Sequence, residues 1–182
     1  HRTMVEASPA GRWTYRAVFL GLVALVIFAK LLPLHPGPGR FPGPDILILM
    51  ASAWIVRRPD YLPVALVAAV FFLADILFMR PPGLWTALAI VGLEALRRRS
   101  FALRDGGFLT EWFTVCTIVT GMFLANTLVL AVFVVDQPGL GLTLIRLITT
   151  LLVYPIVVVL AAWAVGLRKI VPGEVDRLGR RQ

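Results

Sequence analysis

Long apolar runs separated by short polar segments make up most of this chain. Three runs reach or exceed the roughly 20 residues that a helix needs to cross a hydrocarbon core of about 30 Å. A fourth has about 18 residues, and two have about 13, which corresponds to helices of about 20 Å. In chain order the runs cover residues 15–34, 44–56, 62–79, 84–96, 108–135 and 140–167.

Helix-breaking segments lie between the runs. The stretches "PGPGRFPGP", "RRPDYLP" and "RPPG" contain prolines, each of which removes a backbone donor and restricts the residue before it. The last two runs are joined only by "DQPG", so we expect them to form a tight helical hairpin. The pattern therefore predicts an all-α polytopic membrane bundle of about six transmembrane helices.

Composition supports a membrane protein. The 182 residues are 59% hydrophobic and 15% charged, with a mean hydropathy of +0.86. Globular domains are about 45–50% apolar and about 25% charged. The net charge of +8 comes from short basic clusters between apolar runs, which leave no continuous basic face for nucleic acid. Cys116 is the single cysteine, so no intrachain disulfide forms.

The basic residues predict the orientation of the bundle. With six spans and the N-terminus inside, 14 of the 18 Lys and Arg residues lie on the inner side and two in outer loops. We therefore expect both termini in the cytoplasm, with a cytoplasmic segment 1–14, a six-span domain 15–167 and a basic cytoplasmic tail 168–182. A four-span arrangement places 13 bases inside and 3 outside, so charge barely separates the two models. Trp54 and Trp85 favour six spans, because they mark ends of the short runs, where aromatic rings favour the membrane interface.

One carboxylate, Asp75, lies inside an apolar run, in "FFLADILFMRPPG". An unpaired Asp within a membrane is costly, so it needs a partner. Counting residues places Lys30, Asp45, Asp75 and Arg146 in one layer near the outer face. We expect Asp75 to pair with Arg146 or Lys30, with Arg146 favoured for its planar guanidinium. The alternatives are that both bases extend independently to headgroups, or that the layer belongs to a proton or solute pathway.

Small residues in the first short run suggest a docking face. Two short helices cannot fill the membrane thickness, so one side of the bundle is expected to be thinned or recessed. We expect a hydrophobic helix of another protein to pack there against Ala51, Ser52 and Ala53. The alternative is that these residues pack against the protein's own third span.

No set of residues points to catalysis. His35 lies in a Pro/Gly loop without a second ligand nearby, and the serines lack a His or Lys partner at comparable depth. The prolines of "PGPGRFPGP" remove the amides that would bind phosphate. We therefore expect no enzyme activity, no cofactor and no metal site.

Several short motifs resemble those of the MreD family, small polytopic proteins of the bacterial rod-shape system. "GPDILILM" places a Pro-Asp step at residues 44–45, and "ADILFMRPPG" places Asp75 eight residues before Gly83. "LLVYPIVVVLAAWAVGLRK" resembles the last span, with an aromatic-Pro step at residues 154–155. The resemblance covers about residues 15–170. It departs at Phe71, where the family often has Gly.

The resemblance implies a bundle similar to the substrate-binding subunits of vitamin transporters, used as a scaffold in the bacterial cytoplasmic (inner) membrane. Such a scaffold links MreC, a single-span protein, and MreB filaments to RodA and a class B penicillin-binding protein, which build peptidoglycan. MreB contact would involve the cytoplasmic basic loops. The alternative function is a small-solute (vitamin-like) binding subunit of a membrane transporter, and a membrane enzyme is a more distant one.

Overall fold

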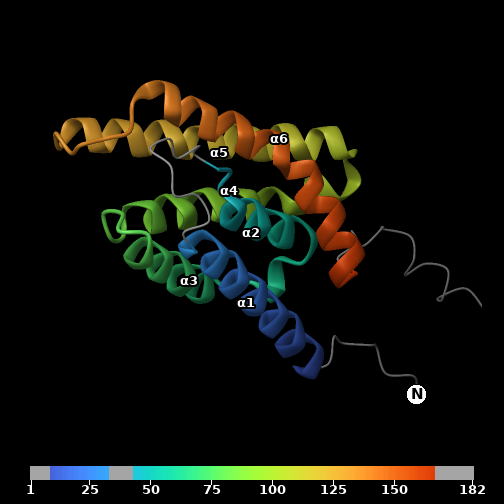
Figure 1. The fold of residues 1–182 in the computed structure, drawn as a ribbon. Coiled ribbons are helices and arrows are strands. Elements are labelled where there is room, and N and C mark those ends of the chain that lie inside the picture. The colour runs from blue at the N-terminus through green and yellow to red at the C-terminus, as the bar shows by residue number, and fades with distance from the viewer. Residues whose placement is uncertain (1–8, 33–42, 167–182) are drawn as a thin grey trace, which may run out of the picture.

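The computed structural model describes residues 9–32 and 43–166, and this part of the chain is entirely helical. It contains six α-helices and one short 3-10 helix, and no strand (Figure 1). The elements are α1 (Pro9–Leu31), α2 (Ile46–Arg57), η1 (Pro59–Tyr61), α3 (Val64–Leu77), α4 (Leu84–Asp105), α5 (Phe108–Val132) and α6 (Leu140–Val165). The predicted all-α fold is confirmed. The tail 168–182 lies outside the described residues, and α1 begins at Pro9 rather than at residue 15.

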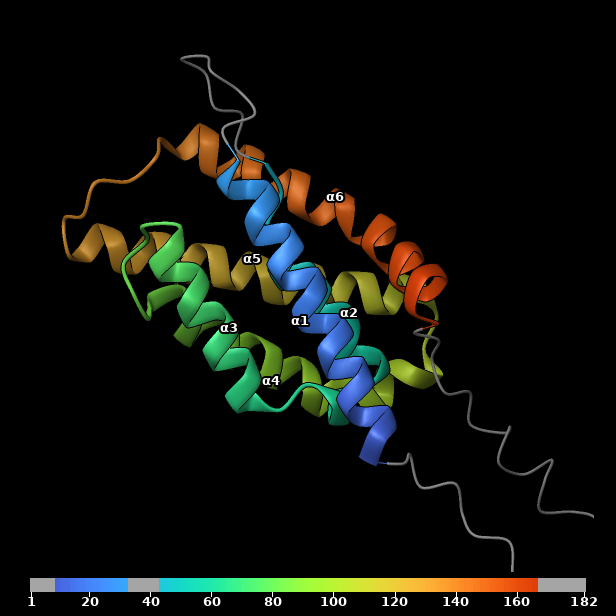
Figure 2. The same cartoon turned by 60° about the horizontal axis from the view of Figure 1, so that its bottom comes forward.

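Successive helices run in alternating directions between two ends of the bundle. The α3–α4 and α5–α6 connections lie at one end, and the α4–α5 connection lies at the other, where α1 begins and α6 ends (Figures 1 and 2). The predicted hairpin is present, because α5 ends at Val132 and α6 begins at Leu140. A hydrogen bond from Trp112 Nε1 to the Leu151 carbonyl oxygen, 3.0 Å long, joins its two helices.

Helix α2 is the centre of the bundle. Its sequence, "ILILMASAWIVR", has no polar face, and every residue from Leu47 to Arg57 is buried. It packs mainly against α4 and α6. The Trp54 ring, 1% exposed, lies edge-on to Phe19 of α1 with ring centres 5.5 Å apart. Trp85 is also buried, so the interpretation of Trp54 and Trp85 as interface markers is wrong.

The docking face predicted on α2 is internal. Ala51 and Ala53 are 0% exposed and Ser52 is 2% exposed, so another protein's helix cannot reach them. The Ser52 hydroxyl donates a 2.7 Å hydrogen bond to the Ile48 carbonyl oxygen, within α2 itself. Helix α2, which carries these residues, packs mainly against α4 and α6. It does not pack mainly against α3, the helix of the predicted third span. Small side chains here allow close packing inside the bundle.

Helix α4 is longer than its apolar run. It continues nine residues past Leu96, through the Arg97–Arg99 cluster, and ends at Asp105 before two glycines. Leu, Ala and Arg are strong helix formers, so propensity continues where hydropathy stops. The Arg97 guanidinium donates hydrogen bonds of 2.6 Å to the carbonyl oxygens of Pro59 and Leu62. The predicted inner loop beginning at this cluster is therefore a helix that supports η1.

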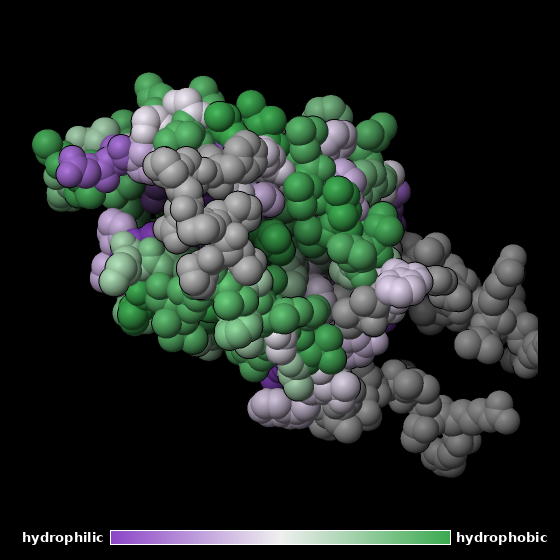
Figure 3. Space-filling model, viewed as in Figure 1, coloured by the Kyte–Doolittle hydropathy of each residue, from purple (hydrophilic) through white to green (hydrophobic). Residues whose placement is uncertain are grey.

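Three helical segments are long and apolar enough to cross a membrane: Arg12–Leu31, Phe108–Val132 and Leu140–Trp163. In each of these helices, only about a fifth of the most apolar part is buried inside the protein. Most large side chains of these helices therefore face outward. Figure 3 shows the result, with hydrophobic residues in green over much of the visible face. Helices α2 and α3, with 12 and 14 residues, are only about 18 and 21 Å long.

Candidate functional site

The predicted outer layer of acids and bases is a buried ion-pair network. Asp45 precedes α2, Asp75 lies in α3, and Arg146 lies in α6. The network also contains Arg80, from the turn between α3 and α4. Asp45 and Asp75 are 2% and 0% exposed, so both carboxylates are removed from solvent and depend on these neighbours. We call these four residues the outer network.

Asp75 caps the N-terminus of α4 from a neighbouring helix. Its Oδ2 accepts hydrogen bonds from the Gly83 amide at 3.2 Å, the Thr86 amide at 3.1 Å and the Thr86 hydroxyl at 2.8 Å. Gly83 is the N-cap residue of α4, with φ of +91°, and has no side chain to cap the helix. A carboxylate at this position satisfies free amides and interacts favourably with the helix dipole. This contact explains the eight-residue spacing between Asp75 and Gly83.

Asp45 joins the start of α2 to α6. Its Oδ2 lies 2.6 Å from Arg146 Nη2 and 3.7 Å from Arg80 Nη1. Its amide donates a 3.0 Å hydrogen bond to the Thr150 hydroxyl, which in turn donates to the Arg146 carbonyl oxygen at 2.6 Å. One carboxylate and one hydroxyl thus fix the beginning of the central helix against the long helix α6.

The predicted pairing of Asp75 with Arg146 or Lys30 is wrong. Asp75 Oδ1 pairs with Arg80 Nη2 at 3.1 Å, whereas Arg146 is held by Asp45. Arg80 returns to Asp75 because the chain reverses after α3. Met79 has a φ of +52°, and the Arg80 amide donates to the Asp75 carbonyl oxygen at 3.0 Å. Within the described residues Lys30 forms no ion pair, and its Nζ lies 5.5 Å from the centre of the Phe78 ring.

Aromatic rings surround the cations of the outer network. The guanidinium carbons of Arg80 and Arg146 lie 5.8 and 5.9 Å from the centre of the Trp85 ring, and Arg146 lies 5.4 Å from that of Phe123. Such cation–π contacts stabilise a charge that has lost water. Burial lowers the pKa of the Arg80 guanidinium, and this outweighs the opposite effect of the Asp45 and Asp75 carboxylates.

A second buried ion pair lies toward the other end of the bundle, and the sequence analysis missed it. Glu111 Oε1, in α5, accepts from Arg57 Nη1 and from the Tyr154 hydroxyl, each at 2.8 Å. Arg57 is 5% exposed, and Glu111 and Tyr154 are 0% exposed. Arg57 is one of the 14 bases that the charge pattern assigns to the inner side, where we expected no buried partner for it. The available signal was an acid in the first turn of one long run and a tyrosine within the next.

Both sets of buried charges join helices that are distant in the sequence. The outer network connects α2, α3, α4 and α6, and the Arg57–Glu111–Tyr154 contact connects α2, α5 and α6. Among the described residues no group of three or more His, Cys, Asp or Glu side chains could hold a metal ion. The chain matches no family model, no curated protein and no solved structure. Its function is therefore inferred from its own residues and their geometry.

Proposed function

We propose that this protein is a membrane scaffold of the bacterial elongation (rod) system, of the MreD type. In this role it links an MreC-like single-span protein and MreB filaments to RodA and a class B penicillin-binding protein, and so maintains rod shape. It performs no catalysis itself. The motifs at residues 44–45, at Asp75 and Gly83, and at residues 154–155 are the sequence basis of this proposal.

One observation carries the proposal: the buried acids are bound by side chains and amides of other helices. Asp75 holds the start of α4, Asp45 holds α2 on α6, and Glu111 holds α2 and α6 on α5. Polar groups used in this way fix helix positions and are not free for a solute. The apolar side chains that remain outward on α1, α5 and α6 offer surface to lipid and to helices of other membrane proteins.

The proposed topology is six spans with both termini in the cytoplasm. The alternating helix directions support it, together with the common end at which α1 begins and α6 ends. The concentration of Lys and Arg in the segments at that end gives the orientation. Helices α2 and α3 cross only part of the bilayer by themselves and depend on the longer helices around them.

The proposal is tested by purification of a tagged chain at its native expression level after crosslinking in cells. We expect enrichment of an MreC-like protein and RodA over an unrelated polytopic membrane protein that carries the same tag. Depletion of the chain is expected to turn rod-shaped cells round. Rods that keep their shape, without enrichment of either partner, would refute the scaffold role. Saturable binding of a vitamin by the purified chain would then support the transporter subunit instead.

A further inference from the structure

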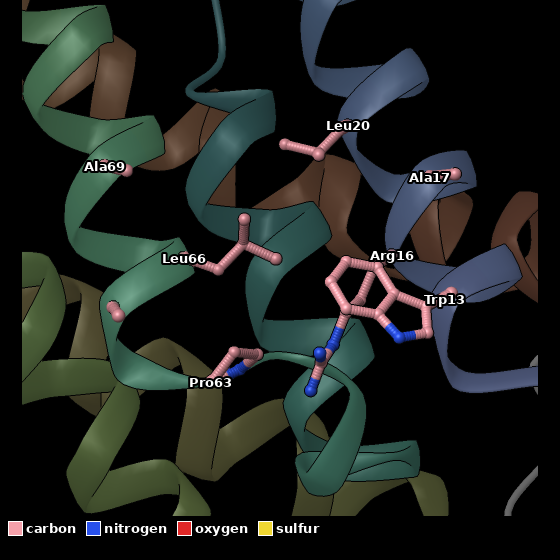
Figure 4. A pocket seen from close by; sticks show the side chains of 8 residues that line it. Trp13, Arg16, Ala17, Leu20, Pro63, Leu66 and Ala69 are labelled. Atoms are coloured by element: carbon pink, nitrogen blue, oxygen red, sulfur yellow. The ribbon is translucent and has the colours of Figure 1, made fainter. Parts of the chain in front are cut away.

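An open groove of about 430 Å³ lies between α1 and α3 on the outside of the bundle (Figure 4). This volume is within the range of roughly 300–1,000 Å³ that is typical of small-molecule sites. The groove exists because α1 packs mainly on α2 and η1 rather than on α3. Its apolar walls are formed by Trp13, Ala17, Leu20, Ala65, Leu66 and Ala69.

The groove has a basic end. Arg16 lines it there, next to Pro63, and the Arg16 Nε donates a 3.2 Å hydrogen bond to the Tyr61 carbonyl oxygen. The guanidinium carbon of Arg58 lies 5.6 Å from the centre of the Tyr61 ring. Arg12 is one helical turn before Arg16 and is exposed. Within the described residues none of these three arginines forms an ion pair.

In the described part of the chain, Glu94 and Asp60 are acids near this end, and Glu94 is already paired with Arg97, which binds the Pro59 carbonyl oxygen. Asp60 in η1 is the acid closest in sequence, and it is exposed and forms no ion pair in the described part of the chain. Trp13, 68% exposed, lies beside Arg16, whose guanidinium carbon is 5.4 Å from its ring centre. An exposed tryptophan next to arginines at a helix end is typical of the headgroup level of a membrane.

We propose that this groove binds one anionic phospholipid, with an acyl chain along the apolar walls and the headgroup phosphate at Arg16 and Arg58. Charge complementarity selects this occupant. A groove that is apolar along its length and cationic at one end matches an amphiphile with an anionic head, whereas a wholly apolar partner helix leaves the arginines without a counterion. Guanidinium also forms bidentate hydrogen bonds with phosphate. The site does not depend on the proposed scaffold role.

The test is a lipid titration of purified, delipidated protein, followed by native mass spectrometry. Phosphatidylglycerol and phosphatidylcholine with the same acyl chains are compared. We expect one tightly held phosphatidylglycerol per chain and at least about fivefold weaker binding of phosphatidylcholine, since each base near an anionic surface contributes roughly fivefold in affinity. Equal binding of the two lipids would overturn the proposal.

Variants locate the site. Arg16→Gln should weaken phosphatidylglycerol binding roughly fivefold and leave phosphatidylcholine binding unchanged. Ala69→Leu fills the exposed groove and should weaken both lipids. The matched controls are Arg99→Gln and Ala131→Leu, at exposed positions outside the groove.

Folding and a competing occupant are tested separately. A lipid-free melt identifies any variant that fails to fold. Arg58→Gln then replaces Arg16→Gln, because Arg58 makes a cation–π contact with the Tyr61 ring and lacks the hydrogen bond that Arg16 donates to a backbone carbonyl group. Variants that bind lipid like their controls would refute the site. A photocrosslinker at Ala69 that captures a protein helix in membranes, without bound lipid in the titration, would assign the groove to a protein partner.

Discussion

Removal of the Asp75 carboxylate is expected to destabilise the bundle strongly. Asp75→Ala deletes three hydrogen bonds to Gly83 and Thr86 and the ion pair with Arg80. It leaves the amides of Gly83 and Thr86, at the start of α4, without the acceptor that Asp75 supplies. Asp75→Asn keeps the shape and one acceptor oxygen but removes the charge, so it separates the capping role from the ionic one.

The size of the effect follows from burial. Removing one member of a buried ion pair costs about 3–5 kcal/mol, because the other charge is left without a partner. Arg80 keeps Asp45 as a neighbour at 3.7 Å, so Asp75→Ala should cost about 3 kcal/mol, at the lower end of this range. A chain of this size loses about 2–4 °C in melting temperature per kcal/mol, which gives a decrease of roughly 6–12 °C. For Asp75→Asn we expect about 1–2 kcal/mol.

Thermal melts in one detergent measure these changes. The matched control is Asp105→Ala, an exposed acid at the end of α4, which should change stability by less than about 0.5 kcal/mol. Double variants then assign the partner. Asp75→Ala should be non-additive with Thr86→Val, which removes only the hydroxyl bond. A melt of Asp75→Ala within about 2 °C of the native protein, or stronger coupling of Asp75 to Arg146 than to Arg80, would refute this reasoning.

Three further predictions concern the Arg57–Glu111 ion pair, the α4 cap and the topology. Arg57→Met or Glu111→Leu alone should lower the free energy of unfolding by about 3–5 kcal/mol in the same melts. The double variant should recover most of this loss, whereas two independent sites would give the sum of both losses. Gly83→Ala should cost about 1–2 kcal/mol, because of the strained φ of +91° and not from a clash, since the added Cβ meets no atom within 4 Å. A cysteine at Arg58 in a Cys116→Ser background should be labelled from the cytoplasm. Labelling from the periplasm would exclude the six-span topology.

The positions of the helices could be predicted well from the sequence where hydropathy and helix length coincide. The hairpin of α5 and α6 is confirmed, because "DQPG" is the only break between two long apolar runs. The end of α4 could not be predicted in this way. Its last nine residues are mostly polar but form a helix, because Arg97 binds the carbonyl groups of Pro59 in η1 and of Leu62 just after it. Two glycines then stop the helix after Asp105.

The outer network could be predicted as a layer but not as a set of pairs. Counting residues along helices placed Lys30, Asp45, Asp75 and Arg146 at one depth, and the structure brings all of these except Lys30 into one ion-pair network. The pairs depend on the turn after α3, where Met79 adopts a positive φ and returns Arg80 to Asp75. Side-chain depth alone carries no information about such a turn. Glu111 was missed because acids are common in the first turn of a helix, where the dipole favours them.

The buried charges also affect the evidence for orientation. Arg57 forms an ion pair with Glu111, and Arg97 binds carbonyl groups of η1 and of the loop after it. Neither arginine is therefore a solvent-exposed loop charge of the kind that sets membrane orientation. Without these two, twelve bases remain in the proposed inner segments. In the proposed outer loops only Arg40 remains, because Arg80 is paired internally. The asymmetry on which the proposed orientation depends therefore does not rely on Arg57, Arg80 and Arg97, which are bound within the protein.

The same polar contacts explain how helices of 12 and 14 residues can exist inside a membrane protein. Backbone groups at a helix end need partners, and lipid supplies none. The Thr150 hydroxyl of α6 accepts a hydrogen bond from the amide of Asp45, which precedes α2. Arg97 of α4 donates hydrogen bonds to carbonyl groups in the segment between α2 and α3. Asp75 supplies the acceptor for the start of α4. Long helices thus provide caps for the short ones, so the ends of the short helices can lie below the membrane surface. This arrangement requires the acids and bases to be fixed in place, which agrees with the scaffold role proposed above.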